Sequence, residues 1–118
     1  MSEFIYKQLI VWQKSIYLLK QVYGLVKILP KEEDYNLKLQ LRRAALSVPS
    51  NIAEGSGRFS LKDKKRFYEI ARSSLIEIDS QLEAGIALEY ISKEDCLDIN
   101  NTAIEISKML SKMISNCK

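Results

Sequence analysis

Residues 42–58, RRAALSVPSNIAEGSGR, lie near the middle of the chain and carry the clearest indication of its fold. A helical spacing of apolar residues enters this stretch and runs through it: Leu37, Leu41, Ala45, Val48 and Ile52. Pro49 lies within the pattern, lacks an N–H group and crowds the carbonyl of Ala45, so we expect a kink or a short break there. Gly55 and Gly57 then end the helix.

The polar residues of this stretch have both structural and functional interpretations. Ser50 and Asn51 can hydrogen-bond backbone groups that Pro49 leaves unpaired. Arg43 and Glu54 are about three helical turns apart, so they share a face and can each pair with a neighbouring helix. A structural or subunit-joining role and a ligand or nucleic-acid site are both open.

The sequence from Gly55 to Arg58 (Gly-Ser-Gly-Arg) also has two interpretations. Its backbone N–H groups, placed before a helix N-terminus, can seat a phosphate. Alternatively it is a plain interhelical turn in which the glycines supply left-handed backbone angles. The GxxxxGK[ST] pattern of phosphate-binding loops is missing, and no strand precedes the turn.

A helix is predicted before this stretch, from about Phe4 or Leu9 to Leu29, with Pro30 ending it. One apolar stripe lies on one face of this helix: Ile5, Leu9, Trp12, Ile16, Leu19, Tyr23 and Val26. A second stripe lies beside it: Val11, Leu18, Val22, Leu25 and Leu29. Such a wide apolar arc indicates packing against more than one neighbour. The acidic run 32–34 suits the N-terminus of the next helix.

Two further helices are predicted after the central stretch. The third opens with Ser60 and Asp63 and the fourth with Ser92 and Asp95, each a serine and an acid at capping-box spacing. The buried face of the third comprises Phe67, Ile70, Ala71, Ser74, Leu75, Ile78, Leu82, Gly85 and Ile86. That of the fourth comprises Ile99, Ala103, Ile106, Leu110, Met113 and Cys117. The aromatic residues Trp12, Tyr17, Tyr23, Phe67 and Tyr68 fall on or beside such faces and are interpreted as core.

Four long segments joined by short turns predict an all-α fold, an antiparallel up-down-up-down four-helix bundle, as one domain over residues 1–118. No run of uncharged residues approaches the length of a membrane span, and the first residues lack the basic region of a signal peptide, so we expect a cytoplasmic protein without membrane association.

The absence of histidine excludes Ser-His and Cys-His nucleophiles, imidazole acid–base chemistry and His-ligated zinc. Cys96 and Cys117 are far apart in sequence and are expected to be free thiols. We therefore expect no enzyme activity, no metal and no cofactor.

Charge is distributed unevenly. From Lys38 to Arg72 nine basic residues face three acids, a net charge of +6, whereas from Glu77 to Glu105 eight acids face one lysine, a net charge of −7. These surfaces can steer an anionic partner, meet each other between subunits, or simply be solvated. The candidate nucleic-acid-binding residues are Arg42, Arg43, Arg58, Lys62, Lys64, Lys65 and Arg66. If about six phosphates were neutralised, binding would weaken about 10³-fold between 50 and 200 mM salt.

The central stretch resembles the motif of the four helix bundle protein family, also called the 23S ribosomal RNA intervening sequence protein family. The resemblance extends to residues 9–14, 29–33, 66–75 and 89–91, although the family often has Gly where Glu89 stands. It implies a four-helix protomer and a ring-like homo-oligomer, a pentamer. The related accessory variability determinants of diversity-generating retroelements bind a reverse transcriptase and nucleic acid, but they are strongly basic, unlike this chain.

Two functions from different classes follow from these features. The chain is either a homo-oligomeric scaffold that binds a protein partner, or an accessory factor that binds its ligand through its basic residues. The ligand of the accessory factor is RNA, DNA or another protein that processes nucleic acid. Around the proline, the structural motif comprises Pro49, Ser50, Asn51, Glu54, Gly55 and Gly57.

Overall fold

The computed structural model describes residues 4–118, and within that range it contains helices and no strands. Four α-helices form the molecule: α1 (Ile10–Val26), α2 (Leu37–Ser56), α3 (Leu61–Ala87) and α4 (Leu97–Ser115). Two short 3-10 helices, η1 (Ile5–Gln8) and η2 (Lys31–Glu33), precede α1 and α2. The predicted all-α class with four long helices is thus confirmed. Residues 1–3, on which the signal-peptide expectation depends, lie outside the described residues.

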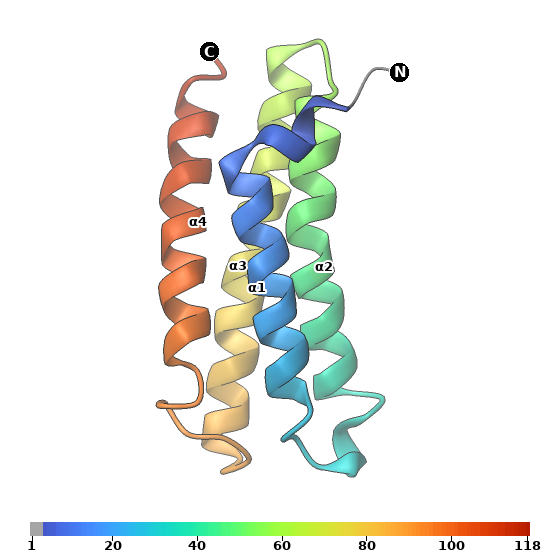
Figure 1. Ribbon diagram of the computed structural model, residues 1–118, viewed down its shortest axis with the longest axis vertical. Coiled ribbons are helices and arrows are strands. Elements are labelled where there is room, and N and C mark those ends of the chain that lie inside the picture. Colours follow the sequence, from blue (N-terminus) through green and yellow to red (C-terminus); the bar gives the residue numbers. More distant parts are fainter. Residues whose placement is uncertain (1–3) are drawn as a thin grey trace.

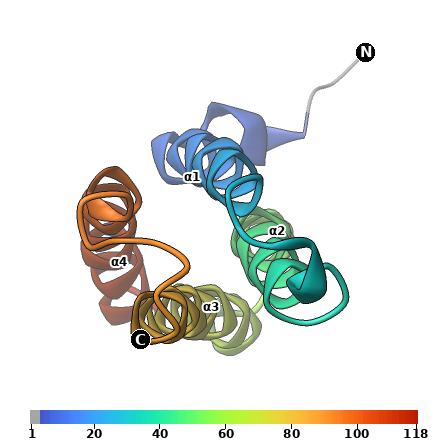
Figure 2. The same ribbon diagram turned by 90° about the horizontal axis from the view of Figure 1, so that it is seen from below.

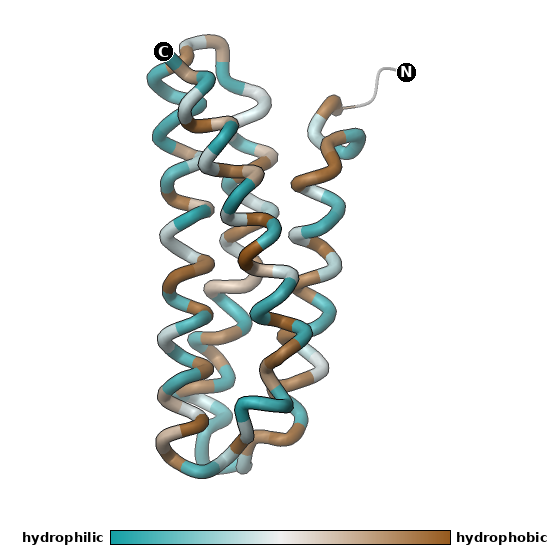
Figure 3. The backbone as a smooth tube through the Cα atoms, turned by 90° about the vertical axis from the view of Figure 1, so that its left-hand side faces the viewer, coloured by the Kyte–Doolittle hydropathy of each residue, from teal (hydrophilic) through white to brown (hydrophobic). Residues whose placement is uncertain are grey.

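The four helices lie side by side along the long axis of the molecule, and the chain reverses direction between each helix and the next (Figure 1). Seen end on, they follow one another around the bundle in the order α1, α2, α3, α4 (Figure 2). The most extensive contact between helices is that of α2 with α3. Hydrophobic and hydrophilic residues recur in alternation along every helix, as amphipathic helices require (Figure 3).

The core agrees with the predicted faces of α2 and α4 and differs in α1. All five apolar residues predicted for α2 are buried, as are Ile99, Ile106 and Leu110 of α4. In α1 the second stripe is buried, whereas the first stripe is exposed or half-buried except at Val26. The buried face also includes Ser15, whose hydroxyl donates to the carbonyl of Trp12 at 2.6 Å. This serine interrupts the apolar pattern of the second stripe, so the sequence does not show which of the two stripes faces the core.

Helix ends differ from the predictions by a few residues. The acidic run forms η2 instead of opening α2, yet the Glu33 carboxylate still accepts the N–H of Leu37, the first residue of α2, at 3.2 Å. Ser60 caps α3 as predicted, accepting the N–H of Asp63 at 3.0 Å. The predicted box of Ser92 and Asp95 forms with both reciprocal hydrogen bonds, but it closes a turn before α4 begins.

Pro49 is buried inside α2, which continues through it without a break. The amide of Asn51 donates to the Ser47 carbonyl at 2.8 Å and to the Ser47 hydroxyl at 2.9 Å. Asn51 therefore does bind a carbonyl of the preceding turn, although not that of Ala45, which faces the proline ring. The Ser47 hydroxyl in turn accepts the buried hydroxyl of Ser74 at 2.8 Å, which joins α2 to α3. A bend of the α2 axis at Pro49 stays a prediction.

Candidate interaction surfaces

Five of the seven predicted cationic residues lie where α2 ends and α3 begins, at the end of the bundle that also holds η1 and the C-terminal end of α4 (Figure 1). We call this set the basic turn: Arg58, Lys62, Lys64, Lys65 and Arg66. They fall within nine consecutive residues that span the loop and the first turns of α3, so the local chain alone brings them together.

The cations of the basic turn are not equally available to a ligand. Arg58 pairs with Glu54 at 3.0 Å, one helical turn earlier. The ammonium of Lys64 donates to the carbonyls of Gly55 and Ser56 at 3.2 and 3.0 Å, so it satisfies the C-terminus of α2. Within residues 4–118, Lys62, Lys65 and Arg66 form no ion pair. We call these three the free cations of the basic turn because they have no ion pair, although the Arg66 guanidinium lies over the Phe67 ring.

The structure places Arg42 and Arg43 away from the basic turn. They lie in the first half of α2, and at 1.5 Å per residue Arg43 is about 20 Å from the end of the helix. Arg42 lies instead near Asp34, whose pKa is lowered chiefly by the hydrogen bond from Lys38 and more weakly by charges that include Arg42. Among the described residues Arg43 has no ion pair, so the pairs expected between neighbouring helices from Arg43 and Glu54 are not formed within the protomer.

Gly55 of the central motif allows close packing of α2 and α3, and neither motif glycine adopts a left-handed backbone angle. No described glycine has a positive φ, so the expectation of left-handed glycines in the turn is wrong. A Cβ on Gly55 would lie 2.6 Å from Cε1 of Tyr68, because α3 crosses this end of α2 at close range. The N–H groups of Gly57 and Arg58 donate to the carbonyls of Glu54 and Gly55, so these two groups are not free to seat a phosphate.

The acidic residues occupy the opposite end of the molecule, on the second half of α3, the α3–α4 connection and the first half of α4 (Figure 1). One of them, Glu105, pairs with Lys14 of α1. Cys96 is buried among the others, and burial together with the nearby charges of Asp95, Glu83 and Asp79 raises the pKa of its thiol. The protomer thus has one basic end and one acidic end.

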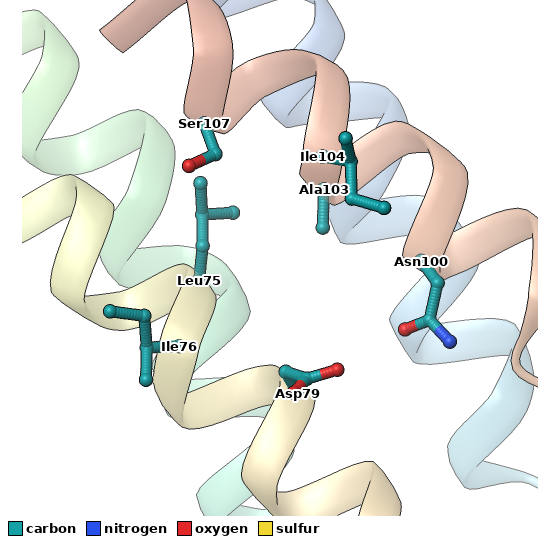
Figure 4. A pocket seen from close by; sticks show the side chains of 7 residues that line it. All are labelled: Leu75, Ile76, Asp79, Asn100, Ala103, Ile104 and Ser107. Carbon is teal, nitrogen blue, oxygen red and sulfur yellow. The ribbon is translucent and has the colours of Figure 1, made fainter. Parts of the chain in front are cut away.

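Helix α4 is flanked by an apolar groove on each side. The groove between α3 and α4 has a volume of about 330 Å³, and Figure 4 shows Leu75 and Ala103 between the helices with Asp79 and Asn100 at one end. Two large apolar side chains on its rim are exposed, Ile76 at 67% and Ile104 at 54%.

The groove between α1 and α4 has a volume of about 560 Å³ and is lined mainly by Leu9, Ile10, Met109 and Met113. Ile10 is largely exposed on its rim. The predicted faces did not include Ile10, Ile76 or Ile104, because each lies one residue away from a regular stripe. That displacement is the only signal the sequence holds for these residues.

Residues 4–118 contain no group of three or more Cys, Asp and Glu side chains arranged to hold a metal ion. None of the helices in this range is long and apolar enough to cross a membrane.

Comparison with known proteins gives two matches to one kind of protein. The family described as 23S rRNA-intervening sequence protein matches residues 7–112. A crystal structure from Bacteroides thetaiotaomicron VPI-5482, described as a protein with unknown function from the S23 ribosomal protein family, superposes with a TM-score of 0.81 at 30% sequence identity. That similarity covers 89% of this chain and 98% of the other. No curated protein matches the chain.

Proposed function

The chain belongs to the 23S rRNA-intervening sequence protein family, and from this premise we propose that it is a non-enzymatic, homo-oligomeric scaffold that binds a protein partner. The proposed assembly is a ring of five protomers. Each protomer is an up-down-up-down bundle with α2 bent at Pro49. The observation that supports self-association is the pair of apolar grooves flanking α4.

Apolar exposure at these grooves is unfavourable for an isolated protomer. Burying one large aliphatic side chain stabilises an assembly by about 1.5–3 kcal/mol, and Ile10, Ile76 and Ile104 are all available. Exposed apolar surface of this kind, next to a polar rim such as Asp79 and Asn100, is typical of contacts between subunits. In this arrangement α4 contributes to an interface on each side, as a ring requires.

The acidic end supplies the surface for the proposed protein partner. Of the eight acids between Glu77 and Glu105, only Glu105 has an ion pair within residues 4–118. A ring repeats this unpaired negative charge once per protomer, and complementary charge favours a partner with a basic face.

The oligomer is tested by replacing both exposed isoleucines of the α3–α4 groove. The native chain is expected to give particles of several subunits, five in the proposed ring, by multi-angle light scattering at micromolar concentration. The double variant Ile76→Asp, Ile104→Asp is expected to be monomeric with an unchanged helical circular dichroism signal, because it places charge in the apolar contact. Leu88→Asp is the control, since Leu88 is exposed but lies outside both grooves. A monomeric native chain contradicts the proposal, as does a double variant that still assembles.

A second function, sequence-tolerant RNA or DNA binding, is favoured by the free cations of the basic turn. Lys62, Lys65 and Arg66 lie together without ion pairs at one end of the bundle. The other four candidate cations are paired, used as a helix cap or placed elsewhere along α2. Binding would be mainly Coulombic, because no helix-turn-helix or zinc motif accompanies these residues.

With three free cations, the binding affinity should depend less on salt than it would if about six phosphates were neutralised. For a single strand the slope is about −0.7 per phosphate, so one protomer that neutralises three phosphates should lose about 20-fold in affinity between 50 and 200 mM salt. The double variant Lys62→Ala, Lys65→Ala is expected to bind more weakly and with a flatter slope. Lys64 stays unchanged because it caps α2.

The matched control for this prediction is Lys20→Ala, Lys27→Ala, which removes two exposed lysines of α1 and its C-cap. It should bind like the native chain in fluorescence anisotropy titrations with labelled RNA and DNA. If both double variants bound equally well, the basic turn would not be the binding site. If the native chain did not bind at low salt, the proposed nucleic-acid-binding function would be wrong.

A further inference from the structure

Phe59 is the most exposed aromatic residue of the described chain, with a relative accessible surface of 103%. It lies in the short loop between α2 and α3, directly after Arg58 and before the capping residue Ser60. No ring contact or cation–π contact involves it in residues 4–118. The largest apolar side chain of this loop thus points into solvent.

The fold itself does not need a phenylalanine at this position. The loop is closed by the hydrogen bond from the N–H of Arg58 to the carbonyl of Gly55, by the Ser60 cap and by the Lys64 cap. Each of these interactions involves the backbone or a polar side chain. An alanine at position 59 would leave all of them in place, so the ring has no role in folding that these contacts reveal.

The surroundings of Phe59 are cationic. Lys62 and Lys65 are both exposed. They lie three residues apart, about one helical turn, so they share one face of α3. The nearby Phe67 has the guanidinium groups of Arg58 and Arg66 each 4.7 Å from its ring centroid, so cations already lie over this ring. Phe59 is the ring at this end whose faces remain free.

A free aromatic face beside unpaired cations fits one kind of ligand especially well. Single-stranded nucleic acids present flat bases that stack on aromatic side chains, joined by phosphates that need positive charge. A duplex hides its base faces in its own stack, so it would use the cations and not the ring. We propose that Phe59 stacks on an unpaired base of a single-stranded RNA or DNA whose phosphates lie on Lys62 and Lys65. This inference rests on the nucleic-acid-binding function proposed above.

The test is a set of anisotropy titrations of the full chain with labelled oligouridylate and oligothymidylate of about 16 nucleotides, long enough for one site. Phe59→Ala is expected to lower affinity by about 5- to 100-fold, the usual loss when one stacking residue is removed. Its salt slope should stay that of the native chain, because no phosphate contact is lost. Phe59→Trp should retain affinity, whereas Phe59→Leu, apolar but without a π face, should resemble Phe59→Ala.

Tyr35 provides the matched control. It is 93% exposed, but it follows the acidic run Glu32, Glu33, Asp34 at the other end of the bundle. Tyr35→Ala removes an equally exposed ring from an acidic setting and should bind like the native chain.

Several results would overturn the inference, and they differ from those that overturn the basic turn. Equal binding by Phe59→Ala and the native chain removes the stacking role and leaves nucleic-acid binding by the cations standing. Absence of any binding by the native chain removes both. Full affinity in Phe59→Leu would indicate a simple apolar contact. A change of particle mass in Phe59→Ala would assign the ring to a contact between copies of the chain. Phe59-dependent binding to anionic vesicles, with none to oligonucleotides, would assign it to a lipid surface.

Discussion

Leu110→Ala is expected to lower the free energy of unfolding by about 2–5 kcal/mol, the usual cost of truncating a fully buried leucine. Leu110 is 0% exposed in α4. Helix α4 packs mainly on α1 and α3, and few buried side chains hold it: Ile99, Ile106, Leu110 and Ile114. Because domains of this size are stable by only about 5–15 kcal/mol, this one change can remove a large part of the total.

Denaturant unfolding followed by circular dichroism measures this loss, at one fixed protein concentration because assembly would couple to stability. Leu97→Ala is the control, since it makes the same chemical change at an exposed position of the same helix and should cost about 0.5 kcal/mol or less. Similar losses in the two variants would show that α4 is not anchored through its predicted face.

The faces of α2 and α4 could be predicted because their apolar residues follow a helical period that only one side of each helix satisfies. In α1 two stripes satisfy it, and periodicity alone cannot say which stripe faces the core. Only the structure shows which stripe is buried: Ser15 lies on the buried side of α1, where its hydroxyl donates to the Trp12 carbonyl. A polar residue whose hydrogen bond lies within its own helix can be buried at small cost, and hydropathy does not reveal this.

The turns show a similar division between local and long-range effects. The hydrogen bonds of Ser60 with Asp63 and of Ser92 with Asp95 form because capping depends on residues three apart in the chain, although only Ser60 caps a helix. Glu89 adopts φ 63°, a left-handed conformation that favours glycine, so the backbone here fits the Gly that the family often carries. The left-handed angles expected for the turn glycines were wrong, and the contact that requires glycine at position 55 depends on Tyr68 of the next helix.

The candidate surface was only partly predictable for the same reason. Sequence proximity gathers the basic turn, but it cannot show that Lys64 caps α2 or that Arg43 is separated from the turn by the length of a helix. The exposure of Phe59 and the grooves beside α4 depend on how helices pack. Neither feature can be read from the periodicity of apolar residues in the sequence.

Gly55→Ala is expected to destabilise the protein by about 2 kcal/mol. A Cβ at this position would lie 2.6 and 2.9 Å from two ring carbons of Tyr68 and 3.2 Å from Cβ of Phe67. Tyr68 is buried and cannot swing into solvent, and burial also raises the pKa of its hydroxyl. Overpacking of this severity costs about 3 kcal/mol, of which the better helix propensity of alanine offsets about 1 kcal/mol.

Two further variants separate this clash from a general need for glycine in the motif. Gly57→Ala meets only ordinary contacts, 3.7 Å from the Glu54 carbonyl oxygen, at a negative φ, so its unfolding free energy should stay within about 0.5 kcal/mol of the native value. In a Tyr68→Leu background the ring is gone, so Gly55→Ala should be neutral or stabilising by up to about 1 kcal/mol. Additive losses from Gly55→Ala and Tyr68→Leu would mean that the two residues do not meet. The requirement for glycine would then lie in the α2 backbone itself and not in the close approach of α3.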